Sequence, residues 1–348
     1  MTNSITWRSP SNIALIKYWG KNGHQIPANP SLSFTLQNSF TETELRFTEK
    51  KSASKEIELS FFLEGKPQPD FEQKIKKYFS DIVAELPFLN QFQFEIHSKN
   101  SFPHSVGIAS SASGMSALAL CLCSLEQHLN GTLKTQDEFF QKASHLARLG
   151  SGSAARSVYG DVVTWGKIED IPGSSDEHAS PFRGKVDKIF DNFHDDILVV
   201  STDKKPVSSR AGHELMDTHP FAKSRYRQAE QNLKTLMEAL AKADLRKFCE
   251  VVENEALTLH ALMMQSSPPV ILLQGGTLDI IKKVRTFREE TGLPVCFTID
   301  AGPNVHLLYP DVIKIDVSHL IQRELIVSCE GKKVISDRIG KGPVKLSA

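Results

Sequence analysis

The sequence lacks several features, and each absence argues against one class of protein. No run approaches the roughly 20 consecutive apolar residues that a bilayer-spanning helix needs, so no membrane span is expected. Lys plus Arg and Asp plus Glu each total 41, so the chain has no global positive field of the kind that attracts nucleic acid or an anionic membrane. The segment MTNSITWRSP lacks the apolar core of a signal peptide.

Paired cysteines are also lacking. The cysteines are five, an odd number, and they show neither C-x-x-C spacing nor a histidine at metal-ligand spacing. Most lie within apolar runs, so we expect reduced thiols in the core of a cytoplasmic protein. They are Cys121, Cys123, Cys249, Cys296 and Cys329.

A regular alternation of strands and helices is absent, which argues against a doubly wound fold and favours an α+β arrangement with helices on one side of a mainly antiparallel sheet. The 348 residues exceed what one core usually organises, so two domains are expected. Residues 166–185 are rich in Gly, Pro, Ser and Asp and predict the passage between them. The domains would then be 1–185 and 186–348.

Local signals predict the main elements. A helix should run from about Ser111 to Asn130-Gly131, and another from Thr135 to about Gly150. A lysine-rich stretch, 46–55, is typical of a hairpin tip between strands. Further helices are predicted at about 221–243, 245–265 and 277–290, and strands at 56–63, 93–97, 161–165, 196–202, 295–299 and 305–309.

The segment SFPHSVGIASSASG, from Ser101 to Gly114, leads directly into an apolar helix. A glycine that permits close backbone approach, serine hydroxyls and the free N–H groups of a helix start together attract phosphate. It is not a Walker loop, because no lysine lies between Lys99 and Lys134. The alternative is an ordinary core helix capped by serine.

A second helix start, ARLGSGSAARS at 147–157, adds a cation to the same pattern. Ser151 and Ser153 flank Gly152, and Arg156 follows about one helical turn later, where its planar guanidinium could bind phosphate oxygens in pairs. Two such sites in one chain would suit a nucleotide and a second phosphorylated molecule. Two unrelated capped helices with a surface arginine remain the alternative.

Two charged residues stand in apolar surroundings. Lys17 follows Ala-Leu-Ile in NIALIKYWGK, so its ammonium should meet a carboxylate unless it reaches solvent at the rim of a sheet. Asp300 leaves the buried strand of FTIDAGPN at a Gly-Pro turn, where a carboxylate can be desolvated and directed at a substrate proton. An Asx-type turn is the structural alternative for Asp300.

Taken together, these segments resemble the diphosphomevalonate decarboxylases of the GHMP kinase superfamily. NIALIKYWGK is similar to that family's opening signature, the loop ending in GIASSA to the superfamily phosphate loop, and ARLGSGSAARS and FTIDAGPN to two further family motifs. The matches follow the family's order from residue 12 to about 309. Departures are Pro30 for a common serine, His104-Ser105-Val106 for Thr-Ala-Ala, and Ala155 for cysteine.

The resemblance implies a fold and a reaction. The N-terminal domain would be like the second domain of ribosomal protein S5, and the C-terminal domain ferredoxin-like, with the site between them. ATP and mevalonate 5-diphosphate would give isopentenyl diphosphate, carbon dioxide, ADP and phosphate by way of 3-hydroxyl phosphorylation, with Mg²⁺ as the metal. A homodimer is also implied.

The resemblance assigns the site residues as well. Asp300 would orient or deprotonate the 3-hydroxyl, and Lys17 would pair with Asp300. His260 and Asn304 would support the site, and a buried core histidine is the alternative for His260. The residues implied to bind substrate are Tyr18, Lys21, Ser151, Ser153 and Arg156. Those implied to bind ATP are Ser98, Asn100, Gly107, Ile108, Ala109, Ser110 and Ser111, with Ser111 also the Mg²⁺ ligand.

Three other functions stay open at this point. The nearest rival is a decarboxylase of mevalonate 5-phosphate, because no arginine for the second phosphate is evident near Ser208-Ser209-Arg210. A metabolite sensor of the same fold would bind nucleotide without turnover. A small-molecule kinase of this fold would release ADP without carbon dioxide.

Overall fold

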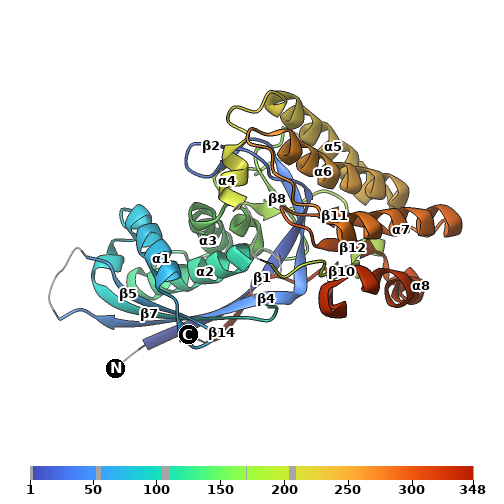
Figure 1. Cartoon of the computed structure of the whole chain (residues 1–348). Coiled ribbons are helices and arrows are strands. Elements are labelled where there is room, and N and C mark those ends of the chain that lie inside the picture. The colour runs from blue at the N-terminus through green and yellow to red at the C-terminus, as the bar shows by residue number, and fades with distance from the viewer. Residues whose placement is uncertain (1–2, 52–55, 104–109, 170, 204–208, 348) are drawn as a thin grey trace.

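Two β-sheets and the helices packed on them make up the molecule (Figure 1). The structure is a computed structural model that describes residues 3–51, 56–103, 110–169, 171–203 and 209–347. All the strand pairs of the two sheets are antiparallel except β5 with β7. The predicted α+β class is confirmed.

The first sheet has the order β14-β1-β4-β7-β5-β6, and β8 and β9 extend it from β4. Its C-terminal strand β14 pairs with β1, so the last residues of the chain return to the first sheet. The strands are β1 (Asn3–Ile16), β4 (Ser31–Glu49), β5 (Glu58–Leu63), β6 (Lys66–Pro67), β7 (Phe92–Asn100), β8 (Val162–Trp165), β9 (Ser180–Pro181) and β14 (Val344–Ser347).

The predicted hairpin tip at 46–55 is wrong. Strand β4 continues to Glu49, but β7 lies between β4 and β5, pairing with β4 in antiparallel and with β5 in parallel register. Two strands that follow each other in sequence are therefore not neighbours in the sheet. Lysine-rich composition marked the turn region, but it carries no information on which strand pairs with which.

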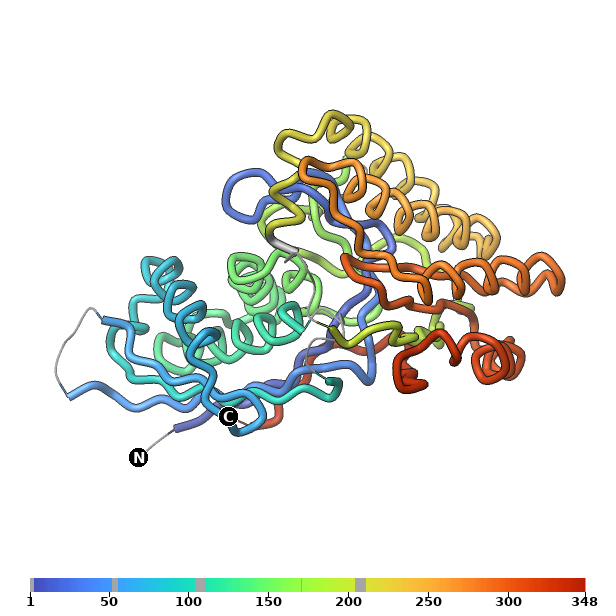
Figure 2. The backbone as a smooth tube through the Cα atoms, viewed as in Figure 1, coloured from blue at the N-terminus to red at the C-terminus, as the bar shows by residue number. Residues whose placement is uncertain are grey.

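The two long strands β1 and β4 link both halves of the molecule (Figure 2). The first residues of β1 alternate between buried and half-exposed, and Ile5 and Trp7 pack into a core with helices α1 (Pro69–Ile82), α2 (Ser110–Asn130) and α3 (Gln136–Gly150). From Ser9 onward every residue of β1 is buried, and Ile13 and Ile16 belong to a second core that includes Leu236 of α5 (Ala222–Lys242). Burial on both faces suits the apolar run of residues 13–16, whereas the buried polar residues before it, such as Ser9 and Asn12, form side-chain hydrogen bonds.

The helices of the first half cover one face of the first sheet (Figure 1). They are α1 (Pro69–Ile82), α2 (Ser110–Asn130) and α3 (Gln136–Gly150), followed by the 3-10 turn η2 (Gly152–Val158). Thr135 caps α3 through a capping box with Glu138, which satisfies two backbone donors at the helix start. The predicted limits of α2 and α3 are confirmed to within a residue or two.

The second half carries a four-stranded antiparallel sheet of order β11-β12-β10-β13 with long helices packed against it. Its strands are β10 (His194–Leu198), β11 (Cys296–Ile299), β12 (Val305–Tyr309) and β13 (Val334–Arg338). Its helices are α4 (Ser209–Glu214), α5 (Ala222–Lys242), α6 (Leu245–Gln265), α7 (Gly275–Thr291) and α8 (Lys314–Leu320). The short strands β2 (Lys21–Asn22) and β3 (Ile26–Pro27) pair with each other.

Two expectations drawn from absences can be compared with this structure. Among the described residues, no helix combines the length and apolar character needed to cross a lipid bilayer. All five cysteines are buried free thiols, as predicted. Burial raises the pKa of the Cys121 thiol to about 12, so this thiol stays protonated and behaves as a small apolar group.

Candidate active site

A cavity of about 660 Å³ is lined by residues from both halves of the molecule. Every residue predicted to act in catalysis, substrate binding or ATP binding that the structure describes lines it, whereas His260 and Asn304, predicted to support the site, do not. The predicted residues that line it are Lys17, Tyr18, Lys21, Ser98, Asn100, Ser110, Ser111, Ser151, Ser153, Arg156 and Asp300. Gly107, Ile108 and Ala109, predicted to bind ATP, lie outside the described residues.

An ion pair joins the two residues predicted to do the chemistry. Lys17 Nζ lies 2.6 Å from Asp300 Oδ1, although the residues are far apart in sequence. The Lys17 side chain is 2% exposed and that of Asp300 is 31% exposed. Lys17 directly follows β1, and Asp300 directly follows β11, so the ends of one strand from each sheet meet at the cavity.

The turn after β11 is held by hydrogen bonds of its own. The Asp300 carbonyl accepts from the Gly302 N–H at 2.6 Å and from His260 Nε2 at 3.1 Å. Asn304 binds both backbone groups of Ser201, at 2.9 and 3.0 Å, and so joins the ends of β12 and β10. His260 therefore contacts the start of the Asp300 turn directly, whereas Asn304, the last residue before β12, joins the end of that turn to Ser201.

Arg156 is a buried cation at the cavity wall. Its Nη1 donates to Ser31 Oγ at 2.8 Å and its Nε to Asn12 Oδ1 at 3.3 Å, both neutral oxygens. Burial lowers the pKa of Arg156 to about 10, and the nearby Asp300 charge works in the opposite direction. Arg156 therefore remains cationic at neutral pH, with further N–H donors to offer an anion.

A cluster of tilted aromatic rings forms another part of the wall. The His213 ring lies 4.2 Å from that of Tyr18 and 4.6 Å from that of Trp19, between centroids. His213 Nδ1 accepts from the Gly20 N–H at 3.0 Å. Burial, with the charges of Lys21 and Arg156, lowers the pKa of His213 to about 3, so the imidazole is neutral.

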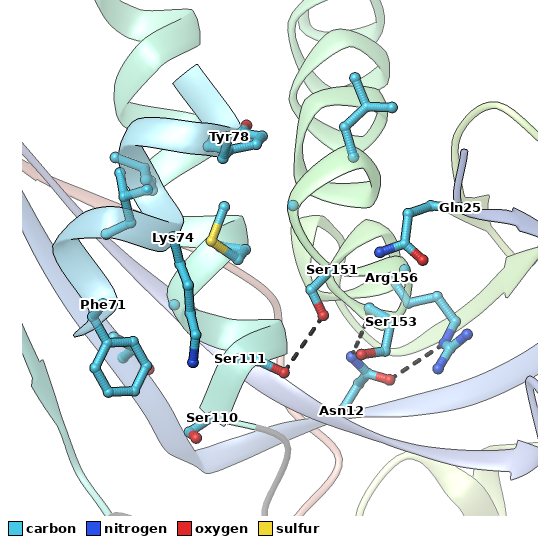
Figure 3. A pocket seen from close by; sticks show the side chains of 18 of the residues that line it. Asn12, Gln25, Phe71, Lys74, Tyr78, Ser110, Ser111, Ser151, Ser153 and Arg156 are labelled. Atoms are coloured by element: carbon cyan, nitrogen blue, oxygen red, sulfur yellow. Dashed lines mark hydrogen bonds between the residues drawn. The ribbon is translucent and has the colours of Figure 1, made fainter. Parts of the chain in front are cut away.

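The two predicted helix starts meet in the cavity. Helix α2 begins at Ser110, and η2 begins at Gly152. The hydroxyls of Ser111 and Ser151 face each other at 3.4 Å, as Figure 3 shows. Helix α2 runs over 21 residues, so the positive end of its dipole and the N–H groups of its first turn are directed to this space.

The cavity has a further arm along α1, where Phe71, Lys74 and Tyr78 lie opposite Ser110 and Ser111 (Figure 3). Strand β7 supplies Ser98, which shares a hydrogen bond of 2.8 Å with Thr43. It also supplies Asn100, which accepts from the Thr41 hydroxyl at 2.7 Å. An apolar ring and an ammonium thus stand next to the helix start that is suited to phosphate.

Sequence reasoning missed several residues of this cavity. Asn12 lies within the quoted N-terminal segment, but its bonds to Ser153 O, at 3.1 Å, and to Arg156 depend on the fold. Lys74 belongs to an amphipathic helix with no motif, and His213 lies in a segment that carried no signal. Only the position of Asn12 beside Lys17 in the N-terminal segment could have drawn attention to it.

A magnesium ion would find oxygen donors at the α2 start. The Ser111 hydroxyl is a suitable hard ligand, and Mg²⁺ usually takes its remaining ligands from water and phosphate oxygens. No group of three or more His, Cys, Asp or Glu side chains placed to hold a metal occurs among the described residues. The Ser111 hydroxyl would therefore suit a Mg²⁺ ion carried by phosphate.

Comparison with known proteins identifies relatives over nearly the whole chain. Residues 9–179 match the diphosphomevalonate decarboxylase-like N-terminal domain, and residues 196–345 match the mevalonate 5-diphosphate decarboxylase C-terminal domain. The chain is 30% identical over 336 residues to the diphosphomevalonate decarboxylase of Candida albicans, an alignment that covers 92% of this chain and 88% of the relative.

Solved structures give the same result. Mevalonate diphosphate decarboxylase from Staphylococcus aureus superposes with a TM-score of 0.85 at 31% identity, covering 100% of this chain and 99% of that one. A structure described as MDDEF in complex with MVAPP, AMPPCP and magnesium superposes with a TM-score of 0.84 at 28% identity, covering both chains fully.

Proposed function

The chain belongs to the diphosphomevalonate decarboxylase family, and we propose that it converts mevalonate 5-diphosphate and ATP into isopentenyl diphosphate, ADP, phosphate and carbon dioxide. Its fold is the GHMP kinase fold of the solved decarboxylases. One observation carries the proposal. The buried Lys17 ammonium contacts a partly exposed Asp300 carboxylate at 2.6 Å, in a cavity that Arg156 also lines.

The first step would transfer the γ-phosphoryl group of ATP to the 3-hydroxyl of the substrate. Asp300 accepts the hydroxyl proton while the new O–P bond forms and the bond from the γ-phosphorus to the bridging oxygen of ADP breaks. A tertiary hydroxyl is a weak acid, so the base must be ionised and close. The adjacent Lys17 ammonium favours the ionised form of the carboxylate.

The second step would break two bonds of the phosphorylated intermediate. The C–O bond to phosphate breaks and leaves positive charge at the tertiary carbon, and the C–C bond to the carboxylate then gives its electron pair to the new double bond. Arg156 would bind the carboxylate that leaves as carbon dioxide. A guanidinium held by Ser31 and Asn12 fixes that carboxylate in place before the step.

The substrate diphosphate would lie against Tyr18, Lys21, Ser151 and Ser153. The Tyr18 hydroxyl is buried and has no hydrogen-bond partner among the described residues, so a ligand oxygen would satisfy it. Burial also raises the pKa of Tyr18 above its ordinary value, so this hydroxyl remains a donor at neutral pH. The neutral His213 ring supports Tyr18 without adding a charge.

ATP would bind along α1 and the start of α2. Ser110 and Ser111 with Gly107, Ile108 and Ala109 would bind the phosphates, and Ser98 and Asn100 would contact the nucleotide. Magnesium, when bound at Ser111, neutralises charge on the phosphate oxygens and so assists the transfer. Residues 1–185 would form the ATP-binding domain and 186–348 the second domain of a cytoplasmic homodimer.

The test is product analysis with purified protein, ATP and Mg²⁺, supplying mevalonate, its 5-phosphate and its 5-diphosphate in parallel. We expect carbon dioxide and ADP in equal amounts from the diphosphate alone. Carbon dioxide from the monophosphate would contradict the diphosphate assignment and make mevalonate 5-phosphate the substrate. ADP without carbon dioxide would indicate a kinase, and nucleotide binding without either product would indicate a sensor.

A further inference from the structure

The main chain at Lys17 lies where the β-ladder ends. Strand β1 finishes at Ile16, whose partner in β4 is Leu32, and the register shifts between Ala14 and Ile16. The N–H and C=O of Lys17 therefore have no strand partner and must be satisfied in another way, because the residue is buried.

Charged side chains from the second half of the molecule satisfy both groups. The Lys17 N–H donates to Glu255 Oε2 at 2.8 Å. The Lys17 carbonyl accepts from Arg225 Nη2 at 3.2 Å and from Asn29 Nδ2 at 3.0 Å. Glu255 belongs to α6 and Arg225 to α5.

Glu255 and Arg225 form a buried ion pair in which both guanidinium nitrogens take part. Nη1 lies 2.7 Å from Oε1 and Nη2 lies 2.6 Å from Oε2, and Asn232 Nδ2 donates to Oε1 at 2.7 Å. The relative exposure of Glu255 is 0% and that of Arg225 is 2%. Paired, rigid groups of this kind fix geometry more strictly than an apolar contact would.

Helix α6 also reaches the other member of the catalytic pair. His260, five positions after Glu255, donates from Nε2 to the Asp300 carbonyl at 3.1 Å. One helix therefore holds the main chain of Lys17 through Glu255 and the main chain of Asp300 through His260. Helix α6 is thus a common support for the two residues whose ammonium and carboxylate meet at 2.6 Å.

We propose that the Glu255–Arg225 pair is a positioning device for catalysis, which fixes the main chain of Lys17 so that its ammonium stays on Asp300. Neither side chain lines the cavity, so the pair would act through Lys17 and not on the substrate. This inference rests on the proposed function, since it assigns a use to the geometry of the Lys17–Asp300 contact.

The same helix offers a matched control. Glu253 is 4% exposed and is paired with Arg285 at 3.2 Å and with Arg288 at 2.5 Å, so it too is a buried glutamate with arginine partners. It does not contact Lys17 or the cavity in the described structure. Replacing Glu253 removes a comparable ion pair without touching the catalytic main chain.

The experiment compares Glu255→Gln with Glu253→Gln, and Arg225→Lys with Arg288→Lys in case a glutamine variant folds poorly. Both glutamine variants should have a lower melting temperature than the wild type. Only Glu255→Gln and Arg225→Lys should lower kcat, by about tenfold, with KM for ATP and for substrate within twofold of wild type. Hydrogen exchange of the Lys17 amide should quicken about tenfold in Glu255→Gln and stay unchanged in Glu253→Gln.

The outcomes separate the two claims. Equal losses of kcat in the two glutamine variants would overturn the positioning role. An unchanged kcat and an unchanged Lys17 amide exchange rate in Glu255→Gln would also overturn it. In either case, carbon dioxide release by the wild type would leave the proposed function standing. A wild type that releases no carbon dioxide from any of the three substrates would overturn the proposed function. Lys17 amide exchange would then still decide whether the pair holds this main chain.

Discussion

The two members of the central ion pair differ in exposure, and the difference suits their proposed roles. The Lys17 side chain is 2% exposed, so it cannot exchange its carboxylate partner for water, whereas Asp300 is 31% exposed toward the cavity. An interaction between charges gains strength where water is excluded. The ammonium is therefore a fixed charge, and the carboxylate is the group that a substrate can reach.

Single residues were predicted from sequence to differing degrees. Lys17 and Asp300 stand out because charged residues next to buried strands need partners, and the structure brings them together. Asn12 and Lys74 did not stand out, since each becomes part of the cavity only through contacts made by distant segments. His213 likewise becomes part of the cavity through its ring contacts with Tyr18 and Trp19, which no local pattern encodes.

His213 gives a prediction about acid stability. The pKa of His213 is about 3 in the folded chain against an ordinary 6.5. Between about pH 3 and pH 6.5, the imidazole is therefore protonated in the unfolded chain and neutral in the folded chain. Stability is therefore lost as the pH falls below about 6.5. Denaturant unfolding should show that the wild type loses ~2 kcal/mol more than His213→Gln between pH 7 and pH 5.

Glutamine is the suitable replacement because its carbonyl oxygen can accept the Gly20 N–H in place of Nδ1. The comparison is a difference between two proteins, so the other titrating groups cancel. Parallel stability curves for the two proteins across this pH range would show that His213 is not held neutral in the fold.

At the scale of elements, local sequence signals predicted where helices begin and end better than which strands lie next to each other in a sheet. Thr135 as a helix start and the apolar run of α2 predicted two helices closely, because a helix depends on contacts within a few residues. Strand pairing depends on distant contacts, so the position of β7 between β4 and β5 was missed. The return of β14 to β1 also lay beyond local signals.

The tight packing of η2 against the aromatic wall gives a second prediction. A Cβ at Gly152 would lie 2.8 Å from Tyr18 Cε1 and 3.0 Å from Trp165 Cη2, so a methyl group must displace one of these rings. Gly152→Ala should raise the KM for the substrate about tenfold, because Tyr18 moves, with a smaller change in the KM for ATP. Steady-state kinetics with each substrate varied in turn measures this.

Gly275→Ala is the control for that change. A Cβ at Gly275, at the start of α7, meets nothing within 4 Å, so both KM values should match the wild type. If Gly152→Ala also retained the wild-type KM for the substrate, Tyr18 would not be part of the substrate site as proposed.

At the scale of the whole molecule, β1 and β4 connect the two halves, and the Asp337 carboxylate of the second half hydrogen-bonds to β4. Asp337 of β13 accepts backbone N–H donors of β4 from Gln37 at 2.9 Å, from Asn38 at 2.7 Å and from Ser39 at 2.7 Å. These donors lie where β1 and β4 shift register, so the ladder leaves them available. Asp337 is 2% exposed.

The third prediction concerns this connection. Asp337→Asn replaces an acceptor of four backbone N–H donors, three from β4 and that of Arg338, by a group that presents one oxygen, and should cost about 2–3 kcal/mol of unfolding free energy. Turnover at a temperature well below the melting transition should stay within twofold, since Asp337 does not line the cavity. Urea unfolding followed by far-ultraviolet circular dichroism measures the loss.

Asp311→Asn is the matched control, because Asp311 is 62% exposed in its contact with His194 and should cost less than 1 kcal/mol. Because Ile13 and Ile16 share a core with α5 and α6, both halves should unfold in one transition in the wild type. An Asp337→Asn protein as stable as Asp311→Asn would show that the carboxylate does not hold the halves together.

Replacing Asp300 tests most directly whether its carboxylate accepts the hydroxyl proton. In a single turnover with ATP, Mg²⁺ and mevalonate 5-diphosphate, the wild type should release carbon dioxide and ADP one to one. Asp300→Asn should bind ATP with unchanged affinity and release both products at least about a hundredfold more slowly, because the carboxamide cannot accept the hydroxyl proton. An Asp300→Asn protein that turned over at the wild-type rate would contradict the central claim.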